Sequence, residues 1–336
     1  MKELPVAVTL GDPAGIGPEI IAGTFTGKGF QDENRAFVIG DTGILRRAVD
    51  LMGLPLGVNE IEKPEEALYE PGSVDVLPVG ELPEDLPFGK LDARAGAAAF
   101  EYVRRATELA LEGSVGAVAT APLNKEAMHM GGYEYPGHTE ILAELTGTKD
   151  FAMMLVTEEL RVIHVSTHVS LREAIDRVSK ERVLTVIRLA RDVLSKIGVE
   201  EPKIAVAGLN PHAGENGLFG DEDTEHIAPA VAEAREEGIN VTGPHPPDTV
   251  FAKARNGEFD MVVVQYHDQG HIPIKLMGFE GGVNVTVGLP FFRTSVDHGT
   301  AFDIAGTGRA DHSSMRITIE LARDLAVSEN VAEERS

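Results

Sequence analysis

The sequence contains no cysteine, few basic residues and no long apolar run, and each shortage excludes a class of function. Without cysteine the chain can form no disulfide and has no thiolate nucleophile, so any metal ligands must be histidine, aspartate or glutamate. No apolar run approaches the roughly 20 residues that cross a bilayer. The first residues also lack the apolar core of a secretory signal. We therefore expect a cytoplasmic protein that does not enter membranes.

Positive charge is also scarce. The 336 residues include 30 Lys and Arg against 54 Asp and Glu, which gives a formal net charge of −24. Such a chain repels nucleic acid and anionic lipid surfaces, so neither is an expected partner. Any anionic substrate must then be bound by a local cationic pocket that works against the field of the whole molecule.

Short apolar runs alternate along the chain with helical patterns. Most of the runs show no polar alternation, as expected for strands covered on both faces. The predicted strands cover residues 5–10, 36–39, 74–79, 114–120, 151–156, 162–166, 203–207, 261–265 and 283–287. The predicted helices cover residues 95–111, 181–197, 223–237 and 312–326. This alternation predicts an α/β fold with a largely parallel or mixed sheet, and 336 residues favour two lobes.

Histidines follow three of these predicted strands. His168, His212 and His267 each stand a few residues past an apolar run, and ligands of open α/β sheets bind beyond the carboxyl ends of the strands. Three imidazoles would hold a divalent metal and leave coordination sites open for a substrate. Asp268 and Gln269 would then orient the imidazoles. Alternatively, the three histidines are unrelated and bonded to loop backbone, and Asp268 and Gln269 are turn residues.

Cations and amides suited to an anionic ligand occur near the end of the chain. Lys275 and Arg293 flank Asn284, and a phosphate or carboxylate is well bound by an arginine fork, a lysine charge and an amide donor. Arg293 follows Pro290-Phe291-Phe292, which predicts a packed stem and a fixed direction. The alternative for each cation is a solvated surface charge.

Two glycine-containing segments are further candidates. In GHTE, Thr139 is a predicted N-cap of a helix that runs to about residue 146, and His138 is placed to hydrogen-bond a substrate. The alternative is a plain cap and a surface histidine. The segment HGTAFDIAGTG has glycines for close backbone approach and an aspartate suited to ribose hydroxyls, which on pattern alone is a weak signal for a nucleotide.

Taken together, the motifs resemble the 4-hydroxythreonine-4-phosphate dehydrogenase family of vitamin B6 biosynthesis. The resemblance spans residues 8–310 and includes TLGDPAGIGPE, TAPLNK, GHTE, STH, GLNPHAGE, YHDQG and GVNVTVGLPFFRTSVDHGTA. It implies two α/β/α lobes around a cleft, as in isocitrate and isopropylmalate dehydrogenases. Residues 1–125 with 285–330 would form the NAD-binding lobe. Residues 126–284 would form the lobe for metal, substrate and dimer contacts.

The same resemblance implies a role for individual residues, in a homodimer whose subunits share the active site. The implied metal ligands are His168, His212 and His267. The implied substrate contacts are His138, Thr139, Lys275, Asn284 and Arg293. The implied NAD contacts are Asp12, Gly15, His298, Gly299, Ala301, Asp303, Ile304 and Gly306. Asp248 and His138 are candidates for proton transfer, and the alternative for Asp248 is an N-cap.

The implied reaction is the metal-dependent oxidation of 4-phosphohydroxy-L-threonine by NAD, followed by β-decarboxylation, in pyridoxal 5′-phosphate biosynthesis. The metal would be Zn²⁺, Mg²⁺, Co²⁺ or Mn²⁺. One variation favours a second substrate class, because the chain has His271-Ile272-Pro273 after YHDQG and Phe302-Asp303-Ile304 after HGTA. That pattern resembles the branch that acts on D-threonate or D-erythronate 4-phosphate, where His271 would meet the hydroxyl on carbon 2.

Two other classes stay open on the sequence alone. A three-histidine zinc site also suits a metallohydrolase that activates water, although it leaves HGTAFDIAGTG without a role. A non-catalytic sensor of a phosphorylated ligand would need the same cations without turnover.

Overall fold

The computed structural model describes residues 4–277 and 282–335, and the chain divides into two compact units. The first unit comprises Met1–Lys149 and Leu289–Val327, and the second comprises Asp150–Gly288 with the C-terminal residues from Ser328. The predicted lobe boundary at residue 125 falls inside the first unit, because the segment after it folds into two helices that pack on helix α4 (Ala93–Leu111). His138 and Thr139 therefore lie in the first unit, not in the lobe for which they were predicted.

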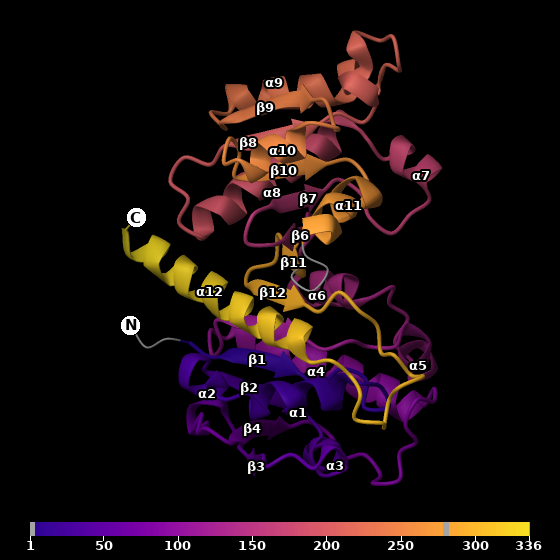
Figure 1. Cartoon of the computed structure of the whole chain (residues 1–336), viewed down its shortest axis with the longest axis vertical. Helices are drawn as coiled ribbons and strands as arrows, with labels where there is room; N and C mark the ends of the chain where they lie inside the picture. The colour runs from indigo at the N-terminus through magenta and orange to yellow at the C-terminus, as the bar shows by residue number, and fades with distance from the viewer. Residues whose placement is uncertain (1–3, 278–281, 336) are drawn as a thin grey trace. The chain divides into compact units, whose positions relative to one another are not determined.

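The first unit contains a six-stranded parallel sheet (Figure 1). In order across the sheet its strands are β3 (Gly57–Glu60), β4 (Ser73–Pro78), β2 (Ala36–Gly40), β1 (Val6–Thr9), β5 (Ala117–Thr120) and β12 (Phe292–Ser295). Every residue of the four strands from β2 to β12 is buried. Continuous burial explains why these strands are not alternately polar, as parallel sheets covered on both faces require.

Helices and glycine-rich turns connect these strands. The helices are α1 (Gly17–Thr26), α2 (Phe30–Glu33), α3 (Thr42–Met52), α4 (Ala93–Leu111), α5 (Lys125–Met130), α6 (His138–Thr146) and α12 (Ser313–Arg335), with a 3₁₀ turn η1 (Pro64–Glu66). Asp41 and Asp92 cap α3 and α4 through their carboxylates, and Asn124 caps α5 through its amide oxygen. Helix α4 lies against β1, β2 and β5.

The second unit contains a mixed sheet. Its strands, in order, are β11 (Val283–Val287), β6 (Ala152–Val156), β7 (Arg161–His164), β10 (Met261–Val264), β8 (Ile204–Ala207) and β9 (Val241–His245). Strand β6 pairs antiparallel with both neighbours, and the strands from β7 to β9 are parallel. The helices are α7 (Leu171–Asp176), α8 (Lys180–Lys196), α9 (Ala228–Glu236), α10 (Val250–Arg255) and α11 (His267–Met277), with a 3₁₀ segment η2 (Pro211–Glu215) and a π-helical turn η3 (Asp223–Ile227).

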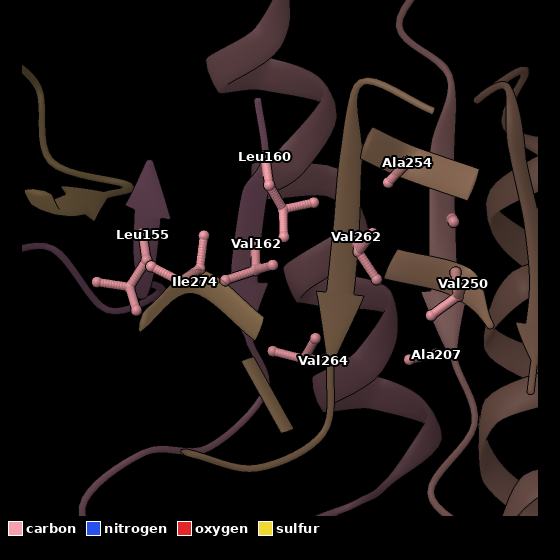
Figure 2. Packing of buried hydrophobic residues seen from close by; sticks show 10 residues of the cluster. Leu155, Leu160, Val162, Ala207, Val250, Ala254, Val262, Val264 and Ile274 are labelled. Carbon is pink, nitrogen blue, oxygen red and sulfur yellow. The ribbon is translucent and has the colours of Figure 1, made fainter. Parts of the chain in front are cut away.

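The valines of β10 form part of the core of this unit. Val262 and Val264 are fully buried with Leu155, Val162 and Ile274, and Figure 2 shows these side chains among others from the strands and from α10 and α11. Burying one such side chain contributes roughly 1.5–3 kcal/mol. The core therefore fixes β10, and with it the point where the polar residues of YHDQGH begin.

The predicted α/β class is confirmed, and each predicted strand overlaps an observed one. The sequence did not predict β3, β9 and β12. Strand β3 is largely exposed, β9 contains glycine and proline, and β12 contains an arginine, so none shows an apolar run. Helix α11 was also missed, since two histidines and an internal Pro273 obscure its periodicity. Among the described residues, no helix is long and apolar enough to cross a bilayer.

Candidate functional site

The first unit holds a buried cation. Arg293 lies in the middle of β12 and is only 2% exposed, as its packed sequence context predicted. Its Nη2 and Nε donate to the hydroxyl of Thr120 at 2.6 and 3.2 Å, at the end of the neighbouring strand β5. Burial lowers the pKa of Arg293 to about 9, with the nearby carboxylate of Glu140 opposing that shift. The guanidinium is therefore a cation at neutral pH, and its bonds to Thr120 of the neighbouring strand β5 hold it in one direction.

Helix α6 begins two residues earlier than the sequence predicted. Gly137 is the N-cap residue, and His138 and Thr139 are already in the first helical turn. The prediction of Thr139 as the cap was therefore wrong. Gly137 is fully extended there, so the turn before the helix, rather than a hydroxyl cap, sets where His138 lies.

His138 presents an unpaired ring nitrogen. Its Nε2 is buried and has no hydrogen-bond partner within the part of the chain that the structure describes. Burial, followed by the charges of Arg293 and Lys125, holds the pKa of His138 well below its ordinary value. A neutral imidazole among cations can donate one hydrogen bond to an anion without adding a third charge. His138, Arg293 and Lys125 thus form a group suited to phosphate or carboxylate, which we call the cationic group.

The loop after β1 contributes a buried carboxylate. Asp12 accepts a hydrogen bond from the N–H of Ala14 at 2.8 Å through Oδ1, while its Oδ2 is buried with no partner among the described residues. Burial raises the pKa of Asp12 to about 6. An unsatisfied buried oxygen of this kind requires a donor, and the hydroxyl and amide groups of a dinucleotide supply such donors.

The HGTAFDIAGTG segment packs directly on this first loop. A Cβ added to Gly15 would lie 2.9 Å from the Cβ of Thr300, and the N–H of Ile16 donates to the carbonyl of Thr300 at 3.1 Å. Within the segment, His298 has a buried Nε2 without a partner among the described residues, and Asp303 is exposed. The two loops that were predicted to bind NAD are therefore in contact within one unit.

One predicted cofactor residue has no free backbone donor. The N–H groups of Gly306 and Gly308 donate to the two carboxylate oxygens of Glu19, at 2.6 and 2.7 Å. The backbone N–H of Gly306 is therefore not available to a ligand. Glu19 was not predicted, although it lies in the GDPAGIGPE motif that was singled out.

In the second unit, two of the three predicted metal ligands lie side by side. His168 follows β7, His267 begins α11, and their ring centroids are 5.6 Å apart. Nδ1 of His267 is hydrogen-bonded to Oδ1 of Asp268 at 2.7 Å. That bond fixes the tautomer and leaves Nε2 of His267 for a metal, which is the usual carboxylate–histidine arrangement of metal sites.

The third predicted ligand is not part of this pair. His212 is exposed on η2, and its ring lies 6.1 Å from that of Phe219. Over residues 4–277 and 282–335, no group of three or more histidines and carboxylates is placed to hold one ion. Of the three predicted ligands, His168 and His267 are the two whose rings lie close together in one chain, and the three-histidine site shared between subunits stays a prediction.

Two further residues of YHDQGH are structural. Gln269 accepts from the N–H of Gln265 and donates to the carbonyl of Gly208, both at 2.7 Å, so it joins α11 to the end of β8. His271 is buried, with its ring stacked 3.6 Å from that of His267 and its Nδ1 bonded to the carbonyl of the same residue. Of the two predicted orienting residues, only Asp268 bonds to an imidazole in this way.

The other predicted substrate residues also lie in the second unit. Lys275 is exposed in the last turn of α11, and Asn284 is half-buried in β11. Asp248 is exposed, and the N-cap of α10 is Thr249, so the predicted alternative role of Asp248 as a cap was wrong. The predicted site residues thus fall into two groups, one in each unit. Thr120 and Lys125 were not predicted individually, but both lie in TAPLNK.

Known proteins resemble this chain over almost its whole length. The family model described as "Pyridoxal phosphate biosynthetic protein PdxA" matches residues 32–322. The D-threonate 4-phosphate dehydrogenase of Salmonella typhimurium is 54% identical over 330 residues, covering 97% of this chain and 100% of the relative. The 4-hydroxythreonine-4-phosphate dehydrogenase of Beijerinckia indica is 49% identical over 327 residues, covering 97% and 96%.

A solved structure is similar over the same length. The crystal structure of a 4-hydroxythreonine-4-phosphate dehydrogenase from Klebsiella pneumoniae matches with a TM-score of 0.93 and 53% sequence identity, covering 97% of this chain and 98% of that one. These relatives are dehydrogenases by name, which disfavours the metallohydrolase and the sensor.

Proposed function

Because this chain belongs to the PdxA family of dehydrogenases, we propose that it oxidises a 4-phosphorylated 3-hydroxy acid with NAD⁺ and a divalent metal and releases CO₂. The observation that carries the proposal is the cationic group, in which Arg293 is buried and His138 keeps an unpaired Nε2. Burying a cation costs desolvation free energy, and an anion bound beside Arg293 and His138 would offset that cost in a chain whose net charge is −24.

We propose D-threonate 4-phosphate as the substrate. Three relatives are named D-threonate 4-phosphate dehydrogenase, and they are 51–54% identical to this chain over almost its whole length. They come from Salmonella typhimurium, Pectobacterium atrosepticum and Cupriavidus necator. The His271-Ile272-Pro273 variation supports the same branch. Since His271 is buried against His267, its influence on carbon 2 would pass through the position of that neighbouring ring.

4-Phosphohydroxy-L-threonine is the second candidate. It is supported by the description of the family model and by the names of the Beijerinckia indica relative and the Klebsiella pneumoniae structure. The two acids differ at carbon 2, where one carries a hydroxyl and the other an amine. The reaction at carbon 3 is the same for both.

The chain's own groups would share the work as follows. The guanidinium of Arg293, fixed by Thr120, and the neutral ring of His138 would bind phosphate or carboxylate through charge-assisted hydrogen bonds. The loops that carry Asp12 and His298 would bind NAD⁺, because both have a buried polar atom that lacks a partner among the described residues. Lys275 and Asn284 would add substrate contacts from the second unit.

Chemistry at carbon 3 needs a proton acceptor and electrophilic assistance. The hydroxyl loses its proton and carbon 3 transfers hydride to NAD⁺, which gives a β-keto acid. That acid loses CO₂, and the electrons of the broken bond remain at carbon 2, which is then protonated. His168 and His267, with Asp268 behind His267, would hold the divalent metal, which when bound would lower the pKa of the hydroxyl and polarise the carbonyl. Asp248 and His138 remain the candidates for proton transfer.

A substrate comparison tests the proposal. NADH formation is measured with D-threonate 4-phosphate, D-erythronate 4-phosphate and 4-phosphohydroxy-L-threonine at equal metal and NAD⁺, and the products are identified by mass. We expect the highest kcat/KM with D-threonate 4-phosphate and dihydroxyacetone phosphate as its product. A higher kcat/KM with 4-phosphohydroxy-L-threonine, yielding 3-amino-2-oxopropyl phosphate, would support the second candidate. No NADH with any of the three would refute the reaction itself.

A further inference from the structure

We propose that Glu19 is a positioning residue that sets the geometry of the segment 300–308 for the dinucleotide; this inference rests on the proposed function. Glu19 lies in the first turn of α1 and is only 1% exposed. Its two carboxylate oxygens accept hydrogen bonds from Gly306 and Gly308, which are nearly 300 residues away in sequence. A carboxylate that accepts two backbone N–H groups forms a stronger contact than two neutral hydrogen bonds would.

The segment is tied at its other end to the same loop. The carbonyl of Thr300 accepts a hydrogen bond from the N–H of Ile16. The side chain of Thr300 packs so closely on Gly15 that a Cβ at position 15 would clash with it. Between these two attachments, Ala301 has a left-handed φ of 41°, which costs energy for a residue other than glycine unless its surroundings hold it. Glu19 and Ile16 therefore fix the two ends of a strained segment that contains Asp303.

Gly306 and Gly308, whose N–H groups bind Glu19, lie in backbone conformations that favour glycine. Gly306 and Gly308 have φ values of 79° and 67°, and a Cβ on Gly306 would lie 2.5 Å from the ring of Phe88. The N–H groups of both glycines donate to Glu19, so the segment would offer a dinucleotide its other backbone and side-chain groups. The position of those groups depends on the carboxylate.

The test is Glu19→Gln in the full-length protein. The amide keeps one acceptor oxygen and turns its NH₂ toward the other N–H, which leaves a buried donor unpaired. We expect NADH binding, measured by calorimetry, to weaken roughly ten- to hundredfold, while the KM for the phosphorylated substrate is unchanged. Hydrogen exchange should become faster in residues 300–308 and stay the same in β1 and β5.

Glu66→Gln is the matched control. Glu66 also accepts a backbone N–H, that of Glu62, in the same unit, but at an exposed turn. It should leave NADH binding unchanged. If Glu19→Gln does not fold, Glu19→Asp serves instead, because it keeps the charge and shortens the reach.

The outcomes separate the inference from the function beneath it. Unchanged NADH affinity in the Glu19 variant overturns the inference, whether or not exchange is faster, and so does an equal loss of NADH and substrate binding. A wild-type protein that binds no NADH overturns the proposed function instead.

Discussion

The two parts of the candidate site differ most in their exposure to solvent. In the first unit, Arg293 and Asp12 are buried and His138 has a buried ring nitrogen. In the second unit, His168 and His212 are exposed, and His267 is partly exposed. Burial shifts the pKa values of Arg293, Asp12 and His138, whereas His168 and His267 lie side by side where solvent reaches them. The difference indicates that packing within the first unit holds its groups in place, while the histidines of the second unit are open to solvent.

The largest effect should come from the exposed part. His267→Ala removes one ring of the close imidazole pair and the nitrogen that Asp268 orients, so we expect turnover to be abolished and Zn²⁺ affinity to fall. Calorimetric titration with Zn²⁺ alone and NADH formation measure the two effects. His129→Ala, at an exposed histidine on α5, is the control. Full activity in the His267 variant after metal removal would contradict the role of the pair.

In the buried part, Arg293→Ala should act on the substrate. It removes a desolvated cation from the cationic group. We expect the loss of binding free energy to be about 3–5 kcal/mol, which lowers kcat/KM roughly a hundred- to several-thousandfold. The KM for substrate should rise far more than the KM for NAD⁺. Arg104→Ala, which removes an exposed guanidinium paired with Glu101 on α4, should change neither. Equal increases in both KM values with Arg293→Ala would remove Arg293 from the substrate group.

Asp12 allows a test of burial by pH. Its pKa is raised to about 6 in the folded chain, so the native state binds more protons than the unfolded state between about pH 4 and 6. Stability should therefore fall as pH rises through that window, by about 3 kcal/mol for this group. The measurement is chemical denaturation of the free protein at several pH values. In Asp12→Asn the free energy of unfolding should lack this part of the decrease. Asp50→Asn, at an exposed carboxylate on α3, should retain the wild-type slope, and the same slope in Asp12→Asn would contradict the burial argument.

Features that depend on neighbouring residues were predictable from the sequence, and features that depend on partners distant in sequence were not. The apolar runs predicted the strands. The polar residues after them remain the predicted ligand sites, because ligands of such sheets bind at strand ends. The burial of Arg293 followed from the two phenylalanines before it. Strand β12 itself was not predictable, because burial of FRTS depends on pairing with β5, which is distant in sequence. The roles of Glu19 and Gln269 were hidden for the same reason, since their partners are backbone groups far along the chain.

The smallest expected effect concerns the residue behind the metal ligand. Asp268→Asn keeps the size of the side chain but weakens the bond to Nδ1 of His267. Loss of such a partner typically lowers metal affinity or activity by about ten- to a hundredfold. We expect Zn²⁺ affinity to fall within that range while NADH affinity is unchanged. A variant with wild-type Zn²⁺ affinity would show that Asp268 does not orient the ring.

The central claim is that one metal-dependent reaction produces NADH and CO₂ together. The most direct measurement follows both products from D-threonate 4-phosphate in one vessel, first after a chelator and then after Zn²⁺, Mg²⁺, Co²⁺ or Mn²⁺ is restored. We expect neither product after chelation and equal amounts of both once a metal is restored. NADH without CO₂, or undiminished NADH in the chelated protein, would contradict it.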